Sequence, residues 1–120
     1  MKIAIPVNEN KSETSICVSF GRAPYFMLHD VEGKTTKYIA NTAAEAQGGA
    51  GLKAAQLILD SGANILLTIR CGQNAAEALN AAQIKIYKAD GLGVAENLAA
   101  FIEGKLTPMT QFHAGFHGHQ

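Results

Sequence analysis

Hydrophobic residues fall on every second position at the start of the chain, which is typical of a β-strand. In residues 1–7 they alternate with alanine and proline, and a period of two places them on one face of a strand. Residues 25–31 and 35–40 are rich in aromatic and β-branched side chains and flank a turn at 32–34, so they predict a β-hairpin. The polar residues before this hairpin predict a loop over 8–19.

The pattern changes after residue 41, where helical periods alternate with short apolar runs. Apolar positions spaced as on one helix face predict a helix over 51–61, which Gly62 ends. A continuous apolar run at 65–69 predicts a strand that is covered on both faces. The remaining predicted elements, in chain order, are a helix that opens at 71–74, a strand over 84–87, a helix that opens at 91–93 and ends at Gly104, and an irregular tail from residue 105.

The predicted order is three strands followed by alternating helices and strands. Because parallel strands joined by helices form right-handed crossovers, we expect a three-layer α/β/α fold. A five-stranded mixed sheet would carry helices on both faces, and the hairpin would supply its antiparallel part. The leading three strands suggest the topology of ribonuclease H. We expect a single domain over 1–105 and a flexible histidine-containing tail over 106–120.

The charge composition argues against binding to large polyanions. Ten lysines and arginines balance ten aspartates and glutamates, and the positive residues are scattered along the chain, whereas nucleic-acid binders concentrate them. We therefore expect neither nucleic-acid nor membrane binding. The first residues resemble no signal peptide, and no apolar run is long enough to span a bilayer. These features predict a cytoplasmic protein.

Three predicted loops follow the carboxyl ends of strands, and ligands bind at this edge of an open α/β sheet. They span residues 8–21, 70–74 and 90–93. The second and third loops open helices, whose first N–H groups and dipole attract anions, and their glycines let a ligand approach the backbone. The loops indicate a site for a compact anionic ligand, although each could serve only to connect a strand to a helix.

A fourth glycine-rich segment, residues 48–51, also precedes a helix. It lacks the Lys-Ser/Thr pair of a phosphate-binding P-loop, so we expect no nucleoside triphosphate site. The segment could form an anion-binding concavity, or it could be a simple lead into the helix.

Potential metal ligands occur at three places in the chain. Cys71 opens a helix, an environment that lowers the pKa of a thiol and permits metal ligation, and Cys17 lies in the first loop. Two cysteines without a C-x-x-C motif fit neither a zinc ribbon nor a disulfide scaffold, and each could instead be a small buried residue. In the tail, His113, His117 and His119 are spaced so that they could ligate copper, nickel or zinc, or they could be incidental.

The sequence contains no recognisable catalytic centre. A nuclease of the ribonuclease H type needs clustered carboxylates for two metals, and the acidic residues here form no obvious set. A serine hydrolase of the α/β type would need a Gly-x-Ser-x-Gly turn, which is missing. We therefore expect that the protein is not an enzyme.

Four motifs occur in order along the chain: MKIAIPV at 1–7, SFGRAPYF at 19–26, GGAG at 48–51 and CGQNA at 71–75. Together they resemble the dinitrogenase iron–molybdenum cofactor biosynthesis family, which includes the NifX-like proteins and the C-terminal domain of NifB. The resemblance covers nearly the whole chain. It implies a ribonuclease H-like fold without a hydrolytic centre, and the binding or carriage of metal–sulfur clusters.

Ser19 stands where many members of this family have a histidine before Phe-Gly, so the resemblance implies no histidine ligand at this position. Among the short members, the sequence is most similar to those of sulfate-reducing bacteria that hold a molybdenum–copper sulfide cluster without covalent attachment. In such a cluster the sulfides already complete the coordination of the metals, so protein ligands are not obligatory. It would therefore be bound through N–H donors, a cation and apolar walls.

The loops and the resemblance together give a set of candidate residues. We expect the turn at 72–74 to present backbone and amide donors, and Gly21 and Arg22 to close the other side, with the guanidinium offsetting the negative charge. The candidate cofactor-binding residues are Ser19, Gly21, Arg22, Gly48, Gly49, Cys71, Gly72, Gln73 and Asn74, and the candidate metal ligands are Cys17, Cys71, His113, His117 and His119.

The predicted function is the non-covalent binding or carriage of an anionic metal–sulfur cluster, of the molybdenum–copper sulfide or iron–molybdenum cofactor type. Two alternatives stay open. The protein could be a small regulatory partner of an ATPase or of a cofactor-assembly enzyme, with no ligand of its own. It could also be a thiol-dependent enzyme that uses Cys71.

Overall fold

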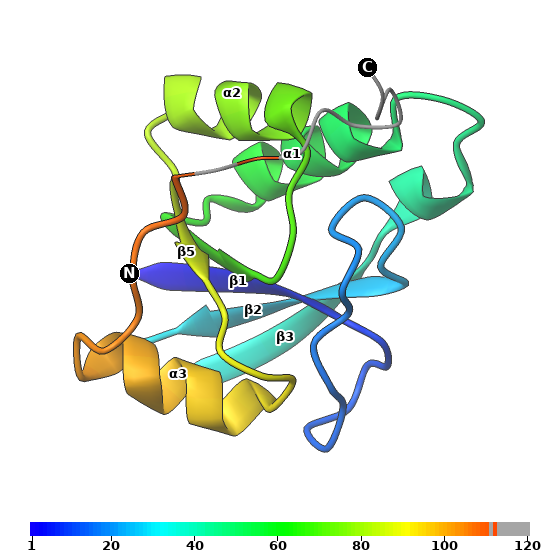
Figure 1. Ribbon diagram of the computed structural model, residues 1–120. Helices are drawn as coiled ribbons and strands as arrows, with labels where there is room; N and C mark the ends of the chain where they lie inside the picture. The colour runs from blue at the N-terminus through cyan, green and yellow to red at the C-terminus, as the bar shows by residue number, and fades with distance from the viewer. Residues whose placement is uncertain (111, 113–120) are drawn as a thin grey trace.

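A five-stranded mixed sheet and three α-helices make up residues 1–110 and 112, which the computed structural model describes (Figure 1). The strands are β1 (Lys2–Val7), β2 (Tyr25–Asp30), β3 (Thr35–Ala40), β4 (Ile65–Thr68) and β5 (Lys85–Lys88). The helices are α1 (Ala50–Ser61), α2 (Gln73–Ala81) and α3 (Val94–Ile102), with a short 3-10 helix, η1 (Thr42–Glu45), before α1. The strand order is β3-β2-β1-β4-β5. β1, β4 and β5 are parallel, and β2 is antiparallel to both of its neighbours.

Hydrophobic side chains on both faces of the sheet give the fold three layers. Alternate residues of a strand point to opposite faces. One set, which includes Ala4 and Leu66, packs against α1 and α2, whereas the other, which includes Ile5 and Leu67, packs against α3 (Figure 1). β1 lies in the middle of the sheet and is buried from Ile3 to Val7, so it contributes to both cores.

The structure confirms the predicted strands and helices to within about two residues, and with them the mixed sheet and the helices on both of its faces. The ribonuclease H topology stays a prediction. The 3-10 helix η1 was not predicted. It begins after Asn41, whose side-chain oxygen accepts a hydrogen bond from the Ala43 N–H (3.1 Å), as an N-cap residue does in a helix.

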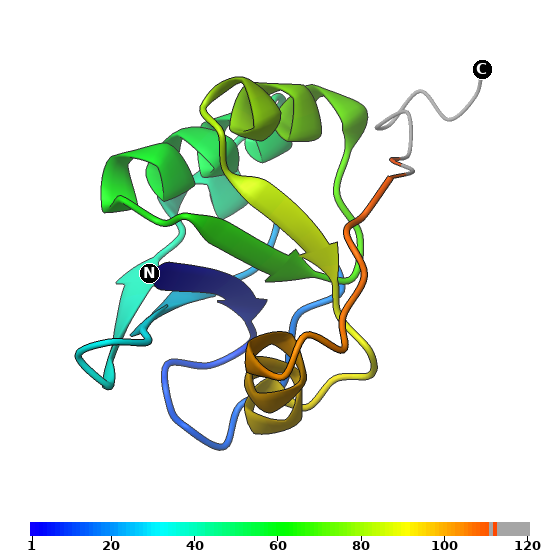
Figure 2. The same cartoon turned by 90° about the vertical axis from the view of Figure 1, so that its left-hand side faces the viewer.

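The segment after α3 is more regular than the sequence predicts. The Lys88 N–H donates to the Thr107 carbonyl oxygen (3.1 Å), and the Met109 N–H donates to the Ile86 carbonyl oxygen (2.8 Å). Figure 2 shows this orange segment passing beside β5. β5 is the edge strand on this side of the sheet, and its unpaired backbone groups favour such pairing. The ordered fold therefore extends into the start of the predicted tail.

No helix in the described part of the chain has the length and apolar character needed to cross a membrane.

Candidate functional site

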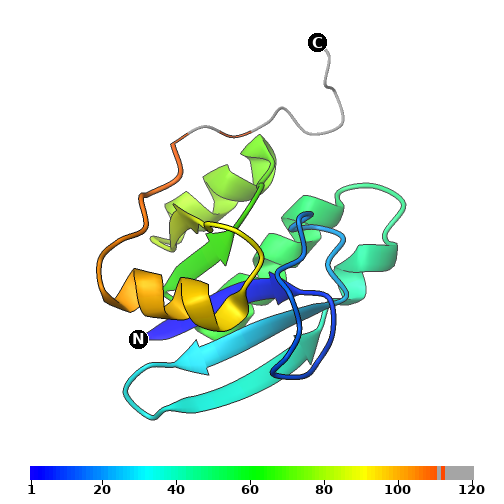
Figure 3. The ribbon, with the colours of Figure 1, turned by 60° about the horizontal axis from the view of Figure 1, so that its bottom comes forward.

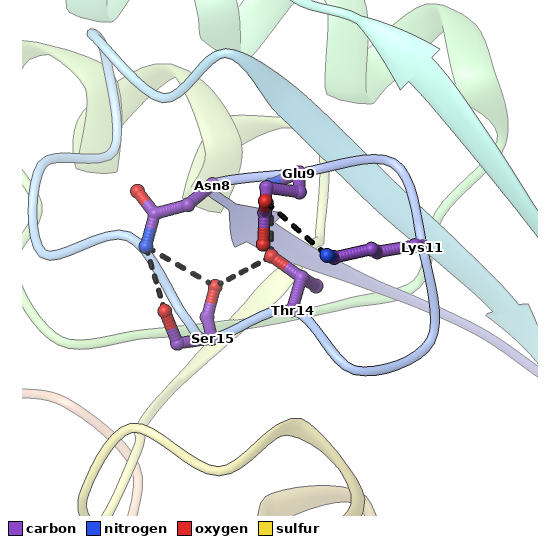
Figure 4. A network of polar contacts seen from close by, with 5 residues as sticks. All are labelled: Asn8, Glu9, Lys11, Thr14 and Ser15. Carbon is purple, nitrogen blue, oxygen red and sulfur yellow. Dashed lines mark hydrogen bonds and ion pairs between the residues drawn. The ribbon is translucent and has the colours of Figure 1, made fainter.

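The loop after β1 is held in shape by its own polar side chains (Figure 4). Asn8 Nδ2 donates to Ser15 Oγ (2.8 Å), and the Glu9 N–H donates to Thr14 Oγ1 (2.8 Å). Lys11 Nζ and Glu9 Oε2 form an exposed ion pair at 3.5 Å. These contacts fold the loop back on itself, so that the chain returns to the end of the sheet.

The returning loop contacts the other two predicted loops. Ser19 forms a parallel bridge with Arg70, and Ser15 forms an antiparallel bridge with Gly93. In Figure 3 the blue loop after β1 lies beside the start of α3. The structure thus confirms that the three loops meet at the carboxyl ends of the parallel strands.

The glycine-rich segment at residues 48–51, which leads into α1, lies where the three loops meet. A Cβ atom added at Gly21 would lie 2.9 Å from the Gly51 nitrogen, and one added at Gly51 would lie 3.6 Å from the Ala75 Cβ. The loop after β1 and the starts of α1 and α2 therefore touch through positions with little or no side chain. We call residues 15–22, 48–51, 70–75 and 90–93 together the loop rim.

α1 and α2 both begin at the loop rim without a side chain that caps their first N–H groups. Their N-cap residues are Gly49 and Gly72, and neither helix has an acidic residue in its first turn. Cβ atoms added at Gly48 and Gly49 would meet open space. A helix N-terminus carries partial positive charge and unpaired N–H donors, so two adjacent starts of this kind make the rim electropositive. α3, by contrast, carries Glu96 in its first turn.

The loop at 90–93 is fixed by a buried asparagine of α3 that the sequence did not predict. The Asn97 side chain is 1% exposed. Its Oδ1 accepts from the Asp90 N–H (2.7 Å), and its Nδ2 donates to the carbonyl oxygens of Asp90 (3.1 Å) and Gly93 (2.7 Å). The sequence carries one signal for the role of Asn97. It is a polar residue three positions after Val94, on the apolar face of α3.

Arg22 lies on the loop rim, but its guanidinium is turned toward η1. Nη1 donates to the carbonyl oxygens of Ala44 and Ala46, both at 2.7 Å. The buried Asn41 strengthens this connection, because its Nδ2 donates to the Gly21 carbonyl oxygen (3.1 Å). Arg22 therefore ties the loop rim to the segment around η1, and its role as a counter-charge for a cluster stays a prediction.

Cys71 is a buried core residue, so the expectation of an activated thiol was wrong. Its side chain is 2% exposed and belongs to the core beneath α1 and α2. Burial disfavours the thiolate and raises the pKa of Cys71 to about 12. The N-terminus of α2, which by itself lowers the pKa of a nearby thiol, has a smaller effect on Cys71 than burial does. Cys17 is half-buried against the same core, and both thiols are free.

The two cysteines should differ strongly in thiol reactivity. At pH 8 the thiolate fraction of Cys71 is about a thousandfold below that of an ordinary thiol, because its pKa is about 12 instead of 9.0. A dithiobis-nitrobenzoate assay on the folded chain should show a rapid phase that Cys17→Ser abolishes and Cys71→Ser retains. The reverse pattern would contradict this assignment, and urea should make both thiols reactive in the wild-type chain.

A hollow of about 490 Å³ opens beside the Cys71 turn. Its walls come from the ends of β4 and β5 and from the segment after α3, and they consist of Ile69, Arg70, Cys71, Lys88, Thr107, Pro108, Met109, Thr110 and Phe112. Another hollow, of about 310 Å³, lies between η1 and α1, and none of the predicted site residues within the described part of the chain lines it.

Among the predicted site residues that the structure describes, only Cys71 lines the larger hollow. Arg70 lies in the second predicted loop, but its position in the sequence predicted no role for it. Lys88 could have been found, because it ends the next parallel strand along the sheet. Met109 and Phe112 could not have been found, since residues after 104 show no pattern that predicts their path.

The described residues contain no group of three or more His, Cys, Asp or Glu side chains that could together hold a metal ion. Cys17 and Cys71 stay predictions as single soft contacts. The predicted ligands His113, His117 and His119 lie outside the described residues.

Residues 1–104 match the family described as dinitrogenase iron-molybdenum cofactor. The chain belongs to this family. Membership in the dinitrogenase cofactor family confirms the resemblance carried by the four motifs, and it connects the chain with cofactor-related binding.

Solved structures of similar proteins share most of the fold. The apo form of the orange protein from Desulfovibrio gigas is 31% identical, with a TM-score of 0.84 over 91% of this chain and 96% of that chain. A Thermotoga protein described as NifB is 35% identical, with a TM-score of 0.80 over 92% and 95%. By sequence, the chain is also similar to an uncharacterized protein of Methanocaldococcus jannaschii, which is 33% identical over 109 residues, 88% of this chain and 89% of that protein.

Proposed function

We propose that the loop rim binds an anionic metal–sulfur cluster without covalent attachment, and that the protein carries or stores this cluster and does not act as an enzyme. The observation that carries the proposal is the pair of helix starts at the rim. α1 and α2 approach each other there through Gly51 and Ala75, and both begin at glycine without a side-chain cap or an acidic first turn. This arrangement favours an anion over a cation or a neutral ligand.

The chemistry of a metal–sulfur cluster matches the donor groups and the open space at the loop rim. Sulfides complete the coordination of the metals within such a cluster, so a full set of protein ligands is not required. Gly72, Gln73 and Asn74 would supply backbone and amide donors, and the open space over Gly48 and Gly49 leaves room for close approach of the cluster. The molybdenum–copper sulfide and iron–molybdenum types, which the family suggests, are both anionic and both suit this site.

A charge placed in the first turn of α2 tests the proposal. Gln73→Glu adds a negative charge at the start of the helix, so it should weaken cluster binding about threefold to tenfold, and added salt should reduce the difference. The measurement is an anaerobic titration of the chain with tetrathiomolybdate and copper(I), followed by visible absorption and by gel filtration of the bound metal.

Gln56→Glu is the matched control, because the two glutamines have the same local contacts. Gln73 Nε2 donates to Glu77 and Gln56 Nε2 donates to Asp60, each four residues further along its helix. Both substitutions therefore cost the same intrahelical contact, but residue 56 lies in α1 away from the rim. Equal loss of binding in both variants would contradict binding at the rim.

A second candidate function is docking to a partner protein without a ligand. The loop rim and the first turn of α1 expose the apolar side chains Val18, Leu52 and Leu92, each about half exposed, and exposed apolar side chains favour protein contacts where they form a patch. Purified chain that holds no metal but co-purifies with a cofactor-assembly protein would support this function. A thiol-dependent enzyme is disfavoured, because burial keeps Cys71 protonated.

A further inference from the structure

One edge of the sheet is covered by the chain itself, and the other is open. At β5, the backbone groups of Ile86 and Lys88 are hydrogen-bonded to the segment after α3. β3 forms the opposite edge (Figure 2), and within the described residues neither a strand nor an isolated bridge pairs with its outer side. β3 has no proline and keeps a continuous register with β2, so it lacks two of the features that protect an edge from pairing with another chain.

The backbone groups that face the open edge belong to every second residue of β3. The Asn41 N–H donates to the Pro24 carbonyl oxygen (3.0 Å), which continues the β2–β3 register and marks a hydrogen-bonded pair. Such pairs alternate along an antiparallel sheet, and the residues between them direct their N–H and C=O groups away from β2. His29 and Thr36 fit this alternation, because their side chains meet at 3.0 Å, as in a non-hydrogen-bonded pair. The outward residues are therefore Thr36, Tyr38 and Ala40.

These outward residues are spaced evenly about Tyr38, so the edge is complementary to a second copy of itself. In an antiparallel pair with a two-fold axis at Tyr38, Thr36 lies opposite Ala40 of the second copy. Tyr38 then lies opposite Tyr38 of the second copy. Each pair of opposite residues would exchange two N–H···O=C bonds. Every outward backbone group of β3 would thus gain a partner, and both copies would use the same residues, as a two-fold contact requires.

The side chains suit this register, because residues directly opposite each other point to the same face of the sheet. On the α3 face, the half-buried Tyr38 would form an aromatic pair with its equivalent. On the other face, Lys37 would lie opposite Ile39 of the second copy, so that its apolar stem covers Ile39 and the two lysines do not face each other. The register also brings Lys34 toward η1 of the second copy, which carries Glu45 and no basic residue.

Two further properties favour a closed pair of copies. The chain carries no net charge with its histidines neutral, so no overall repulsion opposes association. Once β3 is paired, the outer edges of the combined sheet are the two β5 strands, and the segment after α3 covers part of each. Assembly therefore ends at two copies and does not continue as a fibre.

We propose that two copies of the chain associate through β3, in antiparallel register about Tyr38, to form one continuous sheet. A contact of this size is typical of a weak, reversible dimer. The two-fold axis reverses the direction of the strands, so the two loop rims lie at opposite ends of the dimer and both stay open. The inference therefore goes beyond the proposed function and does not depend on it.

Sedimentation velocity of the full chain measures the association. We expect the average mass to rise from that of one copy toward that of two between about 10 µM and 1 mM protein. Ala40→Pro removes an outward N–H that is not needed within one copy, so it should weaken association at least about tenfold. Ala40→Val keeps this N–H and is the matched control, with an expected change below about threefold. Urea unfolding checks that both variants are folded.

Cross-linking tests the register. In the proposed pair the Cα atoms of the two Tyr38 residues lie about 5.5 Å apart, a separation that a disulfide can span. Those of the two Lys37 residues lie on a diagonal at about 7–8 Å, too far to be bridged without movement of the backbone. In a Cys17→Ser background, mild oxidation of Tyr38→Cys should therefore give a covalent dimer at least about tenfold faster than oxidation of Lys37→Cys.

Three outcomes would overturn the proposal. A wild-type chain that stays a single copy up to about 1 mM would exclude self-pairing and leave the open edge to a strand of another protein. Equal association of Ala40→Pro and Ala40→Val would show that the copies meet through another surface. Equal cross-linking of Tyr38→Cys and Lys37→Cys would exclude the register about Tyr38. None of these outcomes bears on cluster binding at the loop rim, which Gln73→Glu tests separately.

Discussion

Replacing Gly21 by alanine is expected to lower the free energy of unfolding by about 1–3 kcal/mol, the range for an added group in a tightly packed position. The added Cβ would lie 2.9 Å from the Gly51 nitrogen and 3.0 Å from its Cα. Both atoms belong to the backbone of α1, so no side chain can rotate to relieve the clash. Either the loop after β1 or the start of α1 must move, and both are parts of the loop rim. Urea unfolding followed by far-UV circular dichroism measures the change.

Gly48→Ala is the matched control for this substitution. A Cβ added at Gly48 meets no atom within 4 Å, so the free energy of unfolding should change by less than about 0.5 kcal/mol. Gly21→Ala should also weaken cluster binding, since it pushes the loop after β1 away from the start of α1 within the loop rim. Equal stability of the Gly21→Ala variant and the wild-type chain would show that the close approach at Gly51 is unimportant.

Replacing Asn97 by alanine should have an effect of similar size, about 2–4 kcal/mol, because buried polar groups lose their partners. Asn97 accepts from one backbone N–H and donates to two backbone carbonyls of the 90–93 loop at 3.1 Å or less. After truncation these groups either stay unpaired or pull the loop open to water. Urea unfolding measures the loss of stability, and hydrogen exchange at Asp90 measures the opening of the loop.

Asn80→Ala is the corresponding control, because Asn80 is an exposed asparagine of α2. It should change the free energy of unfolding by less than about 0.5 kcal/mol. If Asn97→Ala unfolded at the same urea concentration as Asn80→Ala, the hydrogen bonds of Asn97 would not be what fixes the third loop of the rim.

The arrangement of the sheet could be predicted from the sequence because its signals are local. The alternation in residues 1–7, the turn at 32–34 and the glycine at residue 62 each specify their own element. The meeting of the three loops follows from one further rule, that the carboxyl ends of parallel strands share an edge. The 3-10 helix after Asn41 was missed, since an alanine-rich stretch of four residues carries no periodicity.

The contacts that depend on tertiary packing could not be predicted. The helix start at Cys71 suggested a lowered thiol pKa, but burial beneath α1 and α2 has the larger effect and raises it. Arg22 looked like a free cation, whereas its guanidinium binds carbonyl groups more than twenty residues away. Met109 reaches the hollow only because its segment pairs with the edge of the sheet.

An anionic metal–sulfur cluster held at the carboxyl ends of the parallel strands should stay with the protein during purification. The most direct measurement is the metal and acid-labile sulfide content of the chain purified anaerobically from the organism that makes it. We expect molybdenum, accompanied by copper or iron and by sulfide, in near-stoichiometric amounts that gel filtration does not remove and that Gln73→Glu reduces. Native chain that carries neither molybdenum nor sulfide, while it stays attached to a partner protein, would contradict the claim.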